Sequence, residues 1–267
     1  SGHYGTQGPR GCRGPRLDRL GDCMDTAQQI RECVARVQAL RLESQSQPAI
    51  HDAVLRVKRV QARRFAGTYA DLLAGGPYAA ASRFFLEELY SDRDYAERDA
   101  QFARIAGAVE KFFPADVAAT AVALARLHAL TESLDHAMAR AWLDAGEAAG
   151  SDAHAYVQAW RAVGRREDRD GQLTTVLGIG VEMARLTRLP GLRFMLRMMR
   201  GPAAAAGLDA LQRFLEAGFD TFSAMARSRH GADAFLSTIR DREARLIAQL
   251  FDGEPVACET ELAATLG

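Results

Sequence analysis

The residues from 114 to 150, PADVAATAVALARLHALTESLDHAMARAWLDAGEAAG, form the longest uninterrupted helical pattern in the chain. An α-helix turns by about 100° per residue, so residues three, four and seven apart share a face. One broad face of this helix is apolar and carries Val117, Ala121, Leu124, Leu127, Leu134, Met138 and Trp142. We expect other helices to cover this stripe, which makes the 114–150 helix the centre of an all-α fold.

Polar residues interrupt the apolar face of this helix. His128, Thr131 and Asp135 fall in the middle of the stripe, and Glu132 falls at its edge. A buried hydroxyl, imidazole or carboxylate without a partner costs about 1–3 kcal/mol or more. The sequence therefore predicts a buried polar cluster whose members find partners on neighbouring helices.

A second helix, predicted over residues 50–74, offers such partners. Its apolar stripe is interrupted by Gln61 and Arg64. We predict that these two side chains pair with Asp135 and Glu132 in charge-assisted hydrogen bonds. Such buried pairs fix the register of two helices and add little net stability, because desolvation nearly cancels the attraction.

The remaining chain shows the same helical periodicity, broken by glycine and proline. We expect an irregular bundle of about nine or ten helices of roughly 10–30 residues, packed around the 114–150 helix. Residues 1–16 carry glycine at every third position and read as a flexible leader. Residues 17–252 are expected to form one all-helical domain, followed by a tail at 253–267. The charged run at 165–171 reads as a solvated connection or helix end and is the best candidate for a subdomain boundary.

Composition limits the classes of protein to which the chain can belong. Of the 267 residues, 48% are hydrophobic and 25% are charged, as in ordinary globular proteins. Lys plus Arg and Asp plus Glu both number 34, so no net charge favours binding to nucleic acid. The absence of an apolar run of about 18 residues argues against a membrane span, and we expect a cytoplasmic protein. Arginine far outnumbers lysine, which suggests a bacterial genome rich in G and C.

Cysteine and histidine spacing argues against a structural zinc site. The chain has four cysteines: Cys12, Cys23, Cys33 and Cys258. They form no Cys-x-x-Cys pair and have no histidine at zinc spacing. His128, Glu132, Asp135 and His136 lie about one helical turn apart and could converge on one ion. However, the chain has neither the Glu-x-x-His of helical di-iron centres nor the His-Glu-x-x-His of zinc proteases, so we predict no metal.

The residues leave open the binding of a ligand such as haem and one kind of catalysis. Haem requires one axial histidine and an apolar pocket, which His128 could supply beside Leu124 and Leu127. No Gly-x-Ser-x-Gly elbow occurs, and no cysteine lies beside a histidine, so an enzyme with a covalent intermediate is disfavoured. Catalysis by residues that meet only in the folded chain stays open.

Several stretches resemble a known family. The run Phe84-Phe85-Leu86-Glu87-Glu88-Leu89-Tyr90 is followed by Asp94 and by Arg98-Asp99. Further matches are Glu132-Ser133-Leu134-Asp135 and the segment from Met199-Arg200-Gly201-Pro202 to Gly218-Phe219. Together they resemble a family of uncharacterised all-helical bacterial proteins without an established activity, over most of the chain after residue 50. The resemblance implies a helical fold and transfers no catalytic residue.

We therefore keep two functional hypotheses. The first is a non-enzymatic helical protein that self-associates or docks a partner through the Met-rich segment at 192–200. The apolar side of that segment carries Leu192, Met195, Leu196 and Met199. The alternative is a protein that binds a small molecule, such as a tetrapyrrole or a lipid, in a pocket near His128. The other candidate lining residues of that pocket are Phe84, Phe85, Met138 and Trp142.

Overall fold

The structure is a computed structural model of the whole chain, and it describes residues 25–146, 150–229 and 231–267. These residues fold into helices joined by short turns, with no strand among them. In chain order the helices are α1 (Thr26–Ser46), α2 (Pro48–Thr68), α3 (Ala70–Leu73), α4 (Ala79–Glu88), α5 (Ala96–Phe112), α6 (Ala115–Asp144), α7 (Asp152–Val163), α8 (Arg166–Leu186), α9 (Leu192–Met198), α10 (Arg200–Ala205), α11 (Asp209–Ala226), α12 (Gly231–Asp252) and α13 (Pro255–Leu266). The all-α fold class is confirmed.

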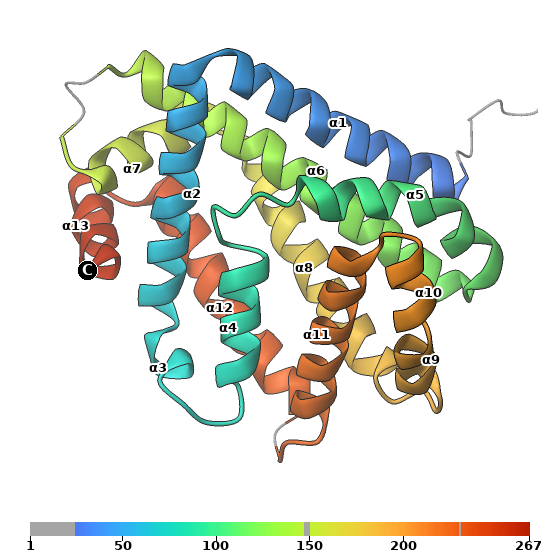
Figure 1. Cartoon of the computed structure of the whole chain (residues 1–267). Helices are drawn as coiled ribbons and strands as arrows, with labels where there is room; N and C mark the ends of the chain where they lie inside the picture. The colour runs from blue at the N-terminus through green and yellow to red at the C-terminus, as the bar shows by residue number, and fades with distance from the viewer. Residues whose placement is uncertain (1–24, 147–149, 230) are drawn as a thin grey trace, which may run out of the picture.

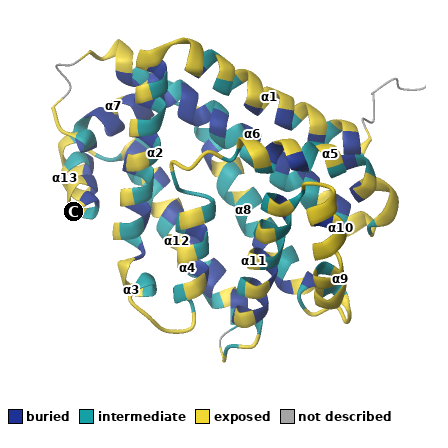
Figure 2. Cartoon of the chain, viewed as in Figure 1, coloured by how far each residue is buried: buried dark blue, intermediate teal, exposed yellow. Residues whose placement is uncertain are grey.

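The long helix α6 is the centre of the bundle, as expected (Figure 1). It packs against α1, α2, α7 and α8, with α5 alongside. The contact with α1 uses small side chains of α6, Val122 and Ala125, which pack with Ala27 and Ile30 of α1 and allow the two helices to approach closely. Figure 2 shows that the buried residues of α1 face inward, while exposed residues cover its outer side and most of α9 and α10.

Three groups of buried apolar residues form the core. One joins α2, α6, α7, α12 and α13, and it includes Met138, Trp142 and Trp160. A second joins α2, α4, α8, α11 and α12 around Phe65 and Phe235. A third lies between α1, α5 and α6. Because each group contains residues from several helices, the helices are held by shared side-chain packing and not by local contacts alone.

The structure corrects three expectations about the helices. The expected number of nine or ten helices is too small for the described part of the chain. The difference comes from the short helices α3, α9 and α10, in which too few residues repeat to show a clear helical period. The tail at 253–267 is not loose: it contains α13, which packs against α2 and α7 and buries Cys258 and Leu262. Of the two alternatives for the run at 165–171, a solvated connection or a helix end, the structure excludes the first and confirms the second, because α8 begins at Arg166.

The remaining expectations concern the organisation of the whole chain. The glycine-rich leader at residues 1–16 lies outside the described residues. The single domain and the candidate boundary at 165–171 stay predictions. Among the described helices, none combines the length and the apolar character that crossing a bilayer requires.

Candidate ligand-binding cavity

An internal cavity of about 330 Å³ runs through the bundle between α6 and α8. These two helices are antiparallel, since Thr131 contacts Gln172 while Asp116, fifteen residues earlier, pairs with Arg185. The cavity wall includes α6 residues from Val117 to Asp135. At 1.5 Å per residue the cavity is therefore about 27 Å long, which makes it a narrow channel.

The half of the cavity next to the start of α6 is apolar. Its wall comes from α5, α6, α8, α9 and α11 and includes Phe102, Ile105, Val109, Leu124, Met183, Leu192, Leu196, Phe214 and Phe219. Most of the apolar stripe predicted on the central helix faces this cavity: Val117, Ala121, Leu124 and Leu127 line it. These side chains are only partly buried, and Ala121 also packs against the core group between α1, α5 and α6.

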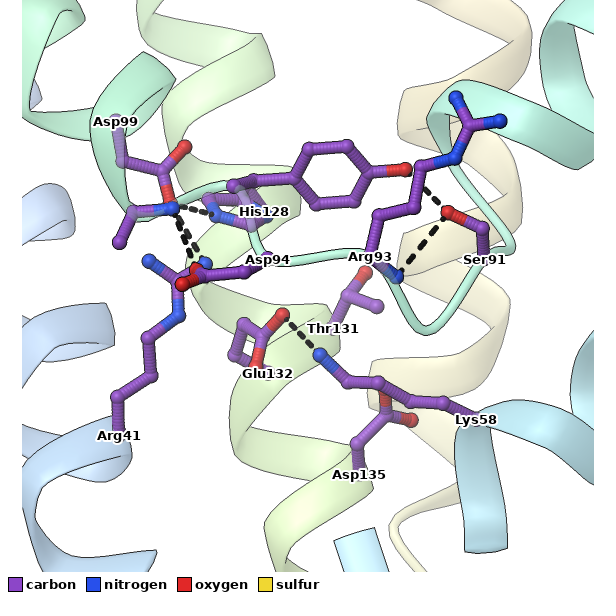
Figure 3. A network of polar contacts seen from close by, with 12 residues as sticks. Arg41, Lys58, Ser91, Arg93, Asp94, Asp99, His128, Thr131, Glu132 and Asp135 are labelled. Atoms are coloured by element: carbon purple, nitrogen blue, oxygen red, sulfur yellow. Dashed lines mark hydrogen bonds and ion pairs between the residues drawn. The ribbon is translucent and has the colours of Figure 1, made fainter. Parts of the chain in front are cut away.

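The other half of the cavity carries the polar cluster, and α2 supplies two of its contacts, of which Figure 3 shows the one between Lys58 and Glu132. The Lys58 Nζ atom donates to Glu132 Oε1 at 2.6 Å, and the Gln61 amide donates to Asp135 Oδ1 at 2.9 Å. Glu132 and Asp135 are both buried. Burial raises the pKa of Asp135, and the nearby charge of Lys58 opposes that rise only in part.

Arg64 has a different partner from the expected one. Its Nη1 atom donates to Glu243 Oε1 on α12 at 2.5 Å, and the Tyr69 hydroxyl donates to the same oxygen at 2.9 Å. The prediction that Arg64 pairs with Asp135 and Glu132 is therefore wrong. The reason is that Glu132 and Asp135 take their partners on α2 from Lys58 and Gln61, whereas Arg64 lies against Glu243 on α12.

His128 is tied to α5 and, through it, to α1 (Figure 3). Its Nε2 atom lies 2.8 Å from Asp99 Oδ2, and Arg41 Nη2 lies 2.8 Å from the same oxygen. Burial acts to raise the pKa of Asp99, but the hydrogen bond from His128 and the charge of Arg41 outweigh it, so this pKa is lowered. Because an ionised carboxylate only accepts hydrogen bonds, Nε2 of His128 donates here and is not free to ligate a metal.

The remaining predicted cluster residues have separate partners. The Thr131 hydroxyl accepts a hydrogen bond from Gln172 at 2.7 Å. His136 points away from His128, towards Glu43 on α1, with 3.7 Å between Nε2 and Oε2. No group of three or more His, Cys, Asp or Glu side chains that could hold a metal ion is found in the described part of the chain.

The predicted pocket residues divide between the cavity and the core. Phe85 lines the cavity together with His128. Met138 and Trp142 instead pack into the core group of α2, α6, α7, α12 and α13, and Phe84 stacks on Phe214 with 5.9 Å between the ring centroids. The expectation that Phe84, Met138 and Trp142 line a pocket is therefore wrong, because these side chains point into packed contacts.

The predicted interaction segment also divides between two faces of α9. Leu192 and Leu196 turn inward and line the apolar end of the cavity. Met195 and Met199 are exposed, together with Phe194 and Met198. The four residues of this segment therefore do not form one surface.

Several cavity residues were missed in the sequence, above all Arg169. Its side chain is only 5% exposed, and its guanidinium carbon lies 4.0 Å from the centre of the Trp160 ring. A signal was present, because Arg169 precedes Leu173 by four residues and Val176 by seven, and both line the cavity. Its position within a mixed-charge run concealed this helical spacing.

These features define an all-α protein with a long internal cavity that is apolar over most of its length and polar at one end. Residues 40–257 match the model of a family described as a domain of unknown function (DUF8198). The chain belongs to this family, in agreement with the resemblance to an uncharacterised family. No curated protein and no solved structure was found to match the chain.

Proposed function

We propose that the protein binds an elongated, mainly apolar small molecule inside the cavity. The observation that carries this proposal is the single channel of about 330 Å³ that joins an apolar half to the polar cluster. This volume falls within the range of small-molecule pockets, about 300–1,000 Å³. A cavity about 27 Å long with this volume fits an extended chain with one polar end.

The organisation of the wall supports the same proposal. Large side chains such as Phe102 and Phe214 border the empty space instead of filling it. Protein interiors are normally close-packed, and unfilled apolar cavities lower stability. A ligand chain restores the lost contacts. Haem is disfavoured as this ligand, because the Nε2 atom of His128 is already hydrogen-bonded to Asp99.

The test is a fluorescence titration with cis-parinaric acid, an 18-carbon polyene whose emission rises in apolar surroundings. The variant Ala121→Phe places a ring in the apolar half of the cavity. Ala119→Phe, on the exposed side of the same helix, is its matched control. We expect wild-type protein and Ala119→Phe to bind the probe alike, and Ala121→Phe to bind at least ten times more weakly.

Two results would overturn the proposal. One is the absence of saturable binding of the probe to the wild-type protein. The other is equal affinity in wild-type protein and in Ala121→Phe, with circular dichroism showing that the variant is folded.

A second candidate function is self-association through the outer face of α9. Its support is the group of exposed apolar residues on that face, with 68% exposure at Phe194 and 62% at Met198. Exposed apolar clusters of this kind mark interaction surfaces, and methionine adapts to varied partners. In sedimentation velocity, we expect a dimer that Phe194→Ser with Met198→Ser converts to a monomer. A wild-type monomer at high concentration would exclude this function.

A further inference from the structure

Arg169 lies at the polar end of the cavity without a partner. Its side chain is 95% buried, and its Nε and Nη2 atoms have no hydrogen bond within the described part of the chain. No carboxylate among these residues lies within 4.0 Å of it. Stacking on Trp160 covers one face of the guanidinium, and Asp135 acts on its charge only from beyond 4.0 Å, so no carboxylate pairs with it directly.

The other cations that line the cavity are already paired. Lys58 contacts Glu132, Arg64 contacts Glu243, and Arg98 contacts Glu88 at 3.3 Å. Asp99 is neutralised by Arg41 and His128. The remaining carboxylate in the wall, Asp135, already accepts a hydrogen bond from Gln61.

An unpaired buried guanidinium is costly, because no partner offsets the loss of its hydration. Burial lowers the pKa of Arg169, which expresses the same cost. Arginine pairs most strongly with a carboxylate, because the planar groups match. Elsewhere in this chain, Arg193 holds Asp220 in this way through Nε and Nη2, at 2.8 and 2.9 Å.

We propose that the ligand is a long-chain carboxylic acid whose carboxylate pairs with Arg169 while its chain extends towards Leu192 and Leu196. This inference rests on the proposed ligand-binding function and specifies its substrate class. A single negative charge is the best match, since Asp135 and Glu132 border the same end of the cavity.

The experiment compares dodecanoate with 1-dodecanol by isothermal titration calorimetry at pH 7.5, below their aggregation limits. Arg169→Met keeps an unbranched side chain of similar length beside Trp160 and removes the charge. Its control is Arg166→Met, on the same helix, where the arginine stacks on Phe251 and pairs with Asp252 outside the cavity wall. We expect wild-type protein and Arg166→Met to prefer the acid at least tenfold. In Arg169→Met, this preference disappears while the affinity for the alcohol is unchanged.

A measurement on wild-type protein keeps the inference testable if Arg169→Met does not fold. The carboxyl signal of [1-¹³C]dodecanoate is followed by NMR as the pH is lowered. Pairing with Arg169 predicts that the bound acid titrates at lower pH than the free acid.

The outcomes separate the two proposals. Equal binding of acid and alcohol by wild-type protein, or a bound acid that titrates at higher pH than the free acid, overturns the role of Arg169 and leaves the ligand-binding function standing. If dodecanoate, dodecanol and cis-parinaric acid all fail to bind, both proposals fall.

Discussion

Replacing Gly67 by alanine tests how closely the last helix, α13, is packed onto α2. A Cβ atom at this position would lie 2.0 Å from the carbonyl oxygen of Thr265 and 2.8 Å from its carbonyl carbon. Non-bonded contacts need about 3.5 Å, so the end of α13 must move by about 1.5 Å. The obstacle is backbone, and no side-chain rotation can relieve it.

The cost of Gly67→Ala follows from what the last turn of α13 holds. Leu266 is buried there, and its carbonyl oxygen accepts hydrogen bonds from Arg63 Nε at 3.1 Å and Nη2 at 2.9 Å. Exposing a leucine costs about 1.5–3 kcal/mol. Alanine in place of glycine gains about 1 kcal/mol in a helix. We expect a net loss of about 1–3 kcal/mol in the free energy of unfolding, once the lost hydrogen bonds are included.

The assay is urea unfolding followed by circular dichroism at 222 nm, with Gly178→Ala as the control. Gly178 is exposed within α8, and its Cβ would meet no heavy atom within 4 Å, so alanine there gains up to about 1 kcal/mol. The two unfolding midpoints should therefore move in opposite directions. A Gly67→Ala protein as stable as Gly178→Ala would refute the close approach of α13 to α2.

Three further predictions concern buried polar groups, and each is read from urea midpoints. Glu243→Gln leaves the charge of Arg64 unpaired and should lower the free energy of unfolding by about 3–5 kcal/mol, whereas the double variant Arg64→Met with Glu243→Gln should recover most of this loss. A double variant as unstable as Glu243→Gln alone would contradict this expectation. Burial lowers the pKa of His136, so the unfolded chain binds a proton more readily and stability falls as the pH drops through about 6.5. His136→Gln should lose less stability between pH 7.5 and 5.5 than wild type does, and an identical loss would exclude this linkage. Thr131→Val removes the hydroxyl that accepts a hydrogen bond from α8 and should cost about 1 kcal/mol, whereas an unchanged midpoint would show that water replaces it.

Much of the fold was readable from local patterns in the chain. The period of apolar residues on α6 identified the central helix, and the glycine and proline stops marked most helix ends. Helical spacing also places Glu243 on the same side of α12 as Ile239 and Leu246, and Glu243 is buried beside Arg64. Gly180 allows α12 to pack close to α8, since a Cβ atom there would lie 2.5 Å from the side chain of Leu236.

The pairing within the polar cluster was not readable in the same way. Periodicity places Arg64 on the inner face of α2, but the way α2 lies between α6 and α12 decides that Arg64 reaches Glu243 while Gln61 reaches Asp135. The inward position of Arg169 depends likewise on where α8 begins, directly after the turn at Gly164 and Arg165. Neither the placement of α2 nor the turn leaves a periodic trace in the sequence.

The sequence by itself determined that this chain is helical and which side of each long helix is apolar, because helical period and stop residues act over a few neighbouring positions. Only the tertiary structure decided what the apolar side of α6 faces. Small side chains bring α1 close to one face of α6, while Val117, Ala121 and Leu124 border an open channel towards α8. Whether an apolar stripe meets a helix or a cavity depends on the distance between helices, which is set by side chains far apart in the chain.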